Sequence, residues 1–69
     1  MKKKQIVVGF SAFDFYRKDL DKLSDREKHE YFLNTETSIS YDSPNDFFNE
    51  LNDGFVDTEN YFWYLIEID

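Results

Sequence analysis

Apolar and polar residues alternate with a two-residue period in several short stretches of the chain, which is the pattern of half-buried β-strands. Residues 4–13 are rich in β-branched and aromatic side chains and predict a first strand. Residues 36–42 alternate cleanly, with Ile39 and Tyr41 on one side and serine-rich positions on the other, and predict a second. Residues 61–68 predict the strongest strand of the chain, because most of them are aromatic or β-branched.

A capping box marks the start of a helix between the first two predicted strands. The Ser24 hydroxyl can accept a hydrogen bond from the Glu27 amide, while the Glu27 carboxylate reaches back to the Ser24 amide. We therefore expect a short helix over residues 25–33, with Asn34 as its stop. The preceding residues 14–23 predict an irregular segment or a single loose turn whose apolar side chains fold back onto the core.

A second helix is predicted between the second and third strands. Ser43 suits the N-cap, and Pro44 suits the first helical position, where its missing amide costs nothing. The helix ends at residues 52–54, with Gly54 as a left-handed cap. The apolar stripe of this helix consists of Phe47, Phe48 and Leu51.

The predicted elements follow the order strand, helix, strand, helix, strand. Helix-containing connections favour parallel neighbouring strands, with both helices on one face for strand order 1-2-3 and on opposite faces for 2-1-3. Ser38, Ser40 and Asp42 would be polar groups beneath a helix, so we expect the first arrangement and an open second face. The fold class is then α+β: a small two-layer β-α-β-α-β domain over residues 1–69, with a three-stranded sheet and two short helices packed on one face.

An open sheet face changes the meaning of the aromatic residues in the last strand. If the even-numbered residues of 61–68 point to the helices, the odd-numbered ones point to the open side, and a contiguous apolar patch of this kind marks an interface. The alternative is that residues 14–23 fold over this face and bury it. The predicted interaction patch consists of Tyr61, Trp63, Leu65, Val7 and Phe13.

The composition fits a small intracellular domain held together by aromatic packing. The 69 residues include eight Phe, five Tyr and one Trp but no Cys, so disulfides and Cys-based zinc sites are excluded. The absence of cysteine fits a reducing cytoplasm, where we expect the protein to reside. The lysine-rich start resembles an export signal, but the apolar run behind it is short and its removal would cost the first strand. No other run approaches the roughly 20 apolar residues of a membrane span.

The acidic residues are concentrated in the second part of the chain. The formal net charge is −7, yet all eight basic residues lie within the first 28 positions. From His29 onward there is no Lys or Arg, and the acidic residues of that part give it a strong negative field. Such a field repels nucleic acids and acidic membranes and attracts basic partners, although it also serves solubility alone.

Motifs for chemistry are missing from the sequence. The single histidine, His29, lies in a charged helical context without a nucleophile motif, and no phosphate-binding glycine loop or HExxH pattern is present. The acidic segment 53–59 could offer oxygens to a cation, but Leu51 and Asn60 fall where the EF-hand spacing requires acidic ligands. We therefore expect no enzyme activity, no cofactor and no metal.

The sequence favours a protein-interaction module that binds another protein or pairs with itself as a homodimer through the open sheet face. Direct binding to nucleic acid or to a membrane is not expected. An alternative is an inhibitor that mimics nucleic acid and occupies the groove of a DNA- or RNA-binding protein. Its surrogate phosphates would be Asp42, Asp46, Glu50, Asp53, Asp57 and Glu59. A small metal-dependent factor is the third alternative.

Overall fold

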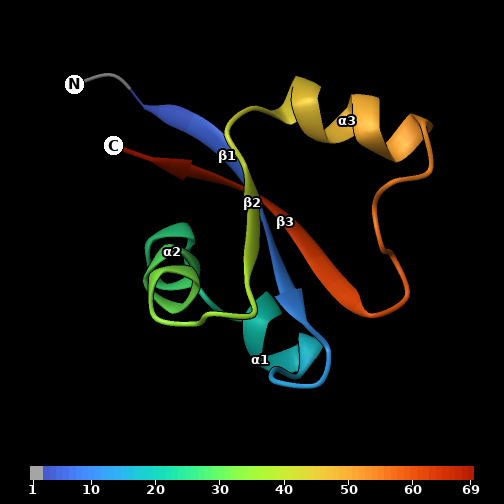
Figure 1. The fold of residues 1–69 in the computed structure, drawn as a ribbon. Helices are drawn as coiled ribbons and strands as arrows, with labels where there is room; N and C mark the ends of the chain where they lie inside the picture. Colours follow the sequence, from blue (N-terminus) through green and yellow to red (C-terminus); the bar gives the residue numbers. More distant parts are fainter. Residues whose placement is uncertain (1–2) are drawn as a thin grey trace.

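The longest strands of the protein lie side by side at the centre of the fold. The computed structural model describes residues 3–69 and places β1 (Lys4–Ser11) between β2 (Ile39–Tyr41) and β3 (Tyr61–Ile68) in one three-stranded sheet (Figure 1). The predicted α+β class and the three-stranded sheet are thereby confirmed. The domain was predicted over residues 1–69, and residues 1 and 2 lie outside the described part of the chain.

Both neighbours of β1 run antiparallel to it, so the prediction of parallel strands is wrong. The connection from β1 to β2 contains two helices, α1 (Arg17–Asp21) and α2 (Asp25–Leu33), where the sequence predicted one. With two helices instead of one, the chain reverses once more and returns to the end of the sheet at which β1 stops. Ile39 of β2 pairs there with Gly9.

The helices cover opposite faces of the sheet, which corrects the prediction that both pack on one face. Under α1 and α2 lies the core cluster, in which Leu20 of α1 packs on even-numbered strand residues. On the other face, α3 (Pro44–Asn52) buries Phe47 against Trp63 of β3. Figure 1 shows α2 and α3 on opposite sides of the sheet. The core cluster consists of Ile6, Val8, Phe10, Leu20 and Ile66.

The polar side of β2 explains why the helix placement was wrong. Ser40 pairs with Val8 and is exposed, as expected for a residue without a helix over it. It is exposed because β2 is a sheet edge and α2 packs mainly on β3 and β1. No helix therefore covers the face of β2 on which Ser40 lies. A polar strand face therefore identified an edge strand and not an open sheet face.

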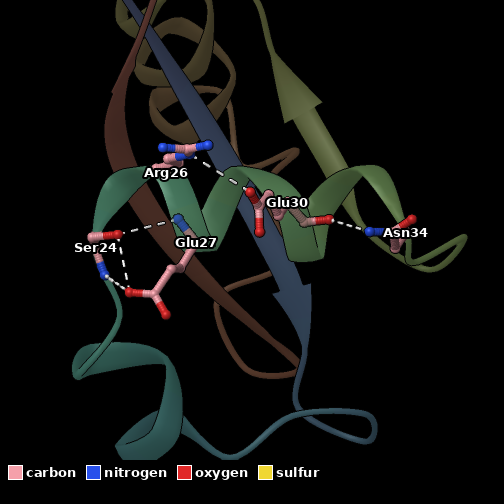
Figure 2. A network of polar contacts seen from close by, with 5 residues as sticks. All are labelled: Ser24, Arg26, Glu27, Glu30 and Asn34. Carbon is pink, nitrogen blue, oxygen red and sulfur yellow. Dashed lines mark hydrogen bonds and ion pairs between the residues drawn. The ribbon is translucent and has the colours of Figure 1, made fainter.

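The local helix signals are confirmed. The Ser24 hydroxyl accepts from the Glu27 amide at 3.2 Å, and the Glu27 carboxylate accepts from the Ser24 amide at 3.3 Å (Figure 2). Figure 2 also shows the Arg26–Glu30 ion pair and the Asn34 side chain that bonds to the end of the helix. These contacts explain why α2 begins and ends where the sequence predicted.

The ends of α3 follow the sequence equally closely. The Ser43 hydroxyl accepts from the Asp46 amide at 3.2 Å, and Pro44 occupies the first helical position. Gly54 has a φ of +80° and donates to the Leu51 carbonyl, which together with the bond from the Phe55 amide to Glu50 forms a Schellman motif. Within residues 3–69, no helix has both the length and the apolar character that crossing a membrane requires.

Candidate protein-interaction surface

Trp63 anchors the face of the sheet that α3 covers. Its ring lies 5.2 Å from that of Phe47 and 5.7 Å from that of Tyr41, measured between centroids. The indole N–H donates to the main-chain oxygen of Asp57 at 2.8 Å and so ties down the loop that enters β3. Most of Trp63 is therefore occupied by contacts within the domain.

Two further members of the predicted interaction patch also hold the fold together. Val7 is only 3% exposed, beneath the α3 side of the sheet. Tyr61 stacks on Trp63 at 5.7 Å, and its hydroxyl donates to the Thr37 carbonyl at 3.2 Å. The structure places residues 14–23 on the opposite face, with Leu20 in the core cluster, so α3 and not this segment covers the odd-numbered side chains.

Leu65, next to these internal contacts, is open to solvent. It is 54% exposed in the middle of a strand, and Phe48 of α3 is 53% exposed nearby. The two side chains line a shallow pocket of about 210 Å³ together with Val7, Phe47 and Trp63. Leu65, Phe48 and the accessible part of Trp63 are called the Leu65 surface below.

Phe48 was assigned to the apolar stripe of the second helix, and its functional potential was missed. Adjacent residues lie about 100° apart around a helix axis, so a helix that buries Phe47 turns Phe48 toward its flank. That spacing was the available signal. Phe13, by contrast, is 87% exposed in the turn after β1 and does not line the pocket, so the structure separates it from the Leu65 surface.

The predicted acidic surface is divided between α3 and the loop that follows it. Asp46, Glu50 and Asp53 follow one another at intervals of four and three residues, which places them on one side of the helix. Asp42 precedes the helix, whereas the last two acids, Asp57 and Glu59, lie in the loop before β3. All six are exposed.

Asp57 differs from the other acids because its carboxylate closes a turn. Its Oδ1 accepts from the amides of Glu59 and Asn60, both at 2.9 Å, and its Oδ2 accepts from the Asn60 side chain at 3.1 Å. The bonds from Asn60, followed by the bond from Glu59, lower the pKa of Asp57 below its ordinary value of 3.8. This carboxylate is therefore used within the chain.

On the α2 side of β3, a tyrosine and an aspartate form a long-range contact. The Tyr64 hydroxyl donates to Asp21 Oδ1 at 2.7 Å, and the Lys28 ammonium lies 4.8 Å from the centre of the Tyr64 ring. Burial, and after it the hydrogen bond to Asp21, raises the pKa of Tyr64 to about 12. The hydroxyl is thereby kept neutral and engaged, which suits a structural contact.

Among residues 3–69, no three His, Asp or Glu side chains lie close enough together to hold a metal ion. Comparison of the chain with protein-family models, with curated proteins and with solved structures gives no match. Only the geometry of this chain therefore indicates its function.

Proposed function

We propose that this domain is a protein-binding module that contacts its partner through the Leu65 surface. The observation that carries the proposal is the 54% exposure of Leu65 in the middle of β3, beside the 53% exposed Phe48. Grouped apolar side chains on a domain surface mark places where another molecule binds. The accessible part of Trp63 lines the same pocket and adds aromatic surface of the kind that often carries interface energy.

The shape of the pocket favours docking over catalysis. Its volume of about 210 Å³ is below the roughly 300 Å³ at which ligand pockets begin. Its lining is aromatic and aliphatic, and the one hydroxyl of a lining residue, that of Tyr64, is bonded to Asp21 on the other side of the sheet. A shallow apolar surface of this kind can accept one or two side chains of a protein partner.

The expected charge of the partner follows from the overall charge of the chain. The chain carries a net charge of −7, and the acidic positions of α3 and the following loop belong to the half without Lys or Arg. Electrostatic steering then favours a partner with a basic contact region and disfavours nucleic acid. A second copy of this chain carries the same negative charge, so we propose a different protein as the principal partner.

The test compares two variants with the same change of side chain. Leu65→Asp places a charge on the Leu65 surface, and Leu33→Asp makes the same change at the 67% exposed end of α2. Tagged versions of both and of the parent are used for affinity capture from the native cell, and light scattering measures their oligomeric state. We expect the parent and Leu33→Asp to capture the same protein and Leu65→Asp to lose it.

Equal capture by all three proteins, or capture that only Leu33→Asp loses, would contradict the proposal. Circular dichroism and urea unfolding of each variant provide the folding control. Both changed positions are exposed, so we expect the two variants to remain folded.

The nucleic-acid mimic remains a second candidate because Asp46, Glu50 and Asp53 share one side of α3. It predicts that the triple change Asp46→Asn, Glu50→Gln and Asp53→Asn abolishes capture of a nucleic-acid-binding protein, while Leu65→Asp leaves that capture intact. Capture that survives the triple change would reject the mimic.

A further inference from the structure

We infer that the partner pairs with the outer edge of β3 as an extended strand whose centre is apolar and whose ends are basic. This inference rests on the proposed function and gives the chemistry of the partner segment. The outer edge of β3 is the side of the strand that faces away from β1, and it consists of the main-chain groups of Tyr61, Trp63 and Leu65.

The hydrogen-bond register shows that these groups point away from β1. The Ala12 amide donates to the Asn60 carbonyl at 2.8 Å, which makes the even-numbered residues of β1 and β3 the hydrogen-bonded pairs. The N–H and C=O groups of the odd-numbered residues of β3 therefore point outward. The Glu67 amide confirms this direction, because it donates to the Asp25 carboxylate of α2 at 2.9 Å.

The outer edge has little of the protection that isolated domains usually give to an edge strand. Such edges are shortened, bulged, or occupied by proline or lysine. β3 instead pairs with β1 over all eight of its residues and contains neither proline nor lysine. Asp25 covers its end at Glu67, whereas the stretch from Tyr61 to Leu65 has no such cover within residues 3–69. An extended segment can add to this stretch by β-augmentation.

The side chains beside the edge define the centre of the partner strand. In an antiparallel pair, residues directly opposite each other project to the same face of the sheet. A strand added at Trp63 and Leu65 therefore projects alternate side chains beside the Leu65 surface. Apolar side chains at those positions would cover the exposed part of Leu65 and extend the packing of α3.

The charges at the two ends of the edge define the ends of the partner strand. Glu59 precedes β3, while Glu67 and Asp69 lie at its other end. Lys3 lies 3.9 Å from Glu67 and offsets part of the negative charge at that end, whereas Glu59 forms no ion pair within residues 3–69. Lysine or arginine at both ends of a partner strand complements this arrangement.

Self-pairing of the same edge meets a charge conflict. The antiparallel register that uses all three free residues places Trp63 opposite its own copy and Tyr61 opposite Leu65 of the second copy. The same register places Glu59 opposite Glu67 of the second copy, twice per dimer. Like charges directly opposite each other destabilise a strand pair, so the edge fits a basic segment better than a second copy.

The probe is a synthetic peptide, Lys-Lys-Val-Thr-Val-Thr-Val-Lys-Lys, titrated into the full chain. Its three valines can lie opposite Tyr61, Trp63 and Leu65, and its first and last lysines then lie opposite Glu67 and Glu59. Fluorescence of the single tryptophan, Trp63, follows binding at the site itself. We expect saturable binding, with the largest amide NMR shifts at residues 61–67.

Two matched peptides separate charge from main-chain pairing. Replacing all four lysines by glutamate is expected to weaken binding at least about tenfold. Methylating the three valine amides removes the donors that face β3 and is expected to abolish binding. Methylating the two threonine amides removes donors on the other side of the peptide and is expected to leave binding to β3 intact. Equal binding of the lysine and glutamate peptides, or no effect of valine methylation, overturns the inference.

A variant of the chain gives an independent measurement. Glu59→Lys is expected to weaken the lysine peptide and strengthen the glutamate peptide, each by several-fold, while Glu36→Lys, an equal charge change outside the sheet, changes the ratio of the two affinities far less. If no peptide binds, the inference is wrong. The proposed protein-binding function would still hold if Leu65→Asp loses the partner that the parent captures. Dimerisation of the parent through β3 would overturn it in favour of a second copy.

Discussion

Gly9 and Trp63 lie directly opposite each other on β1 and β3, and the Trp63 indole covers the position that a side chain at Gly9 would occupy. A Cβ atom built on Gly9 would lie 2.5 Å from Cζ3 of the indole. The glycine therefore creates the space in which the indole lies across the sheet, reaches Phe47 and bonds to the loop at Asp57.

Replacing Gly9 by alanine tests this relationship. We expect Gly9→Ala to lower the free energy of unfolding by roughly 1 to 3 kcal/mol, because the added methyl group forces the indole out of its packed position. Urea denaturation followed by circular dichroism measures the loss. In a Trp63→Val background the same change should cost much less, and an equal cost in both backgrounds would show that the indole is not the cause.

The second glycine has a conformational role and no steric one. Gly54 has a φ of +80°, and a Cβ atom there would have no neighbour within 4 Å. We expect Gly54→Ala to destabilise the fold by about 1 kcal/mol, because a Cβ atom disfavours the left-handed region. Gly54→Asn should cost less, since asparagine tolerates this conformation better. Equal losses for both in urea denaturation would argue against the backbone as the cause.

These two glycines illustrate what the sequence could and could not predict. The role of Gly54 follows from the residues immediately before it, and the structure confirms it as the cap of α3. The role of Gly9 depends on Trp63, more than fifty positions away, and no local pattern indicates which residue will lie opposite it. Helix ends are determined by neighbours in the sequence, so the bounds of α2 and α3 were predicted correctly.

The predictions of strand direction and helix placement were wrong for the same physical reason. Direction and placement depend on how many times the chain reverses between β1 and β2. The five-residue α1 has Tyr16 as its N-cap residue and no side-chain cap that could mark its start in the sequence. Polar residues on β2 are compatible with an open sheet face and equally with an edge strand. The side of β3 on which Leu65 lies followed from alternation, but its exposure depends on where α3 packs.

The capping box at the start of α2 stabilises the fold through the Ser24 side chain. Ser24→Ala removes the hydroxyl that accepts from the Glu27 amide. We expect a loss of about 1 kcal/mol in the free energy of unfolding, the usual contribution of a serine N-cap. Ser40→Ala, on the exposed side of β2, is the control and should change stability by less than about 0.5 kcal/mol. Indistinguishable unfolding midpoints for the two variants would contradict this role of Ser24.

The contact between Tyr64 and Asp21 predicts a separate titration at high pH. One of the five tyrosines should ionise at a pKa of about 12, while an unfolded tyrosine ionises near its ordinary value of 10.0. Because the pKa is raised in the folded state, the contribution of this contact to stability is fully present below pH 10 and is lost as the pH rises through 12. Absorbance titration of the parent against Tyr64→Phe isolates this group.

An Asp21→Asn variant separates the two causes of the raised pKa. Burial is the larger cause and the hydrogen bond to Asp21 the smaller one, so the pKa of Tyr64 should fall in this variant and still remain above 10.0. A fall to 10.0 would show that the carboxylate alone raises the pKa. No change would show that the hydroxyl does not donate to Asp21 in solution, and α1 would then lack this link to β3.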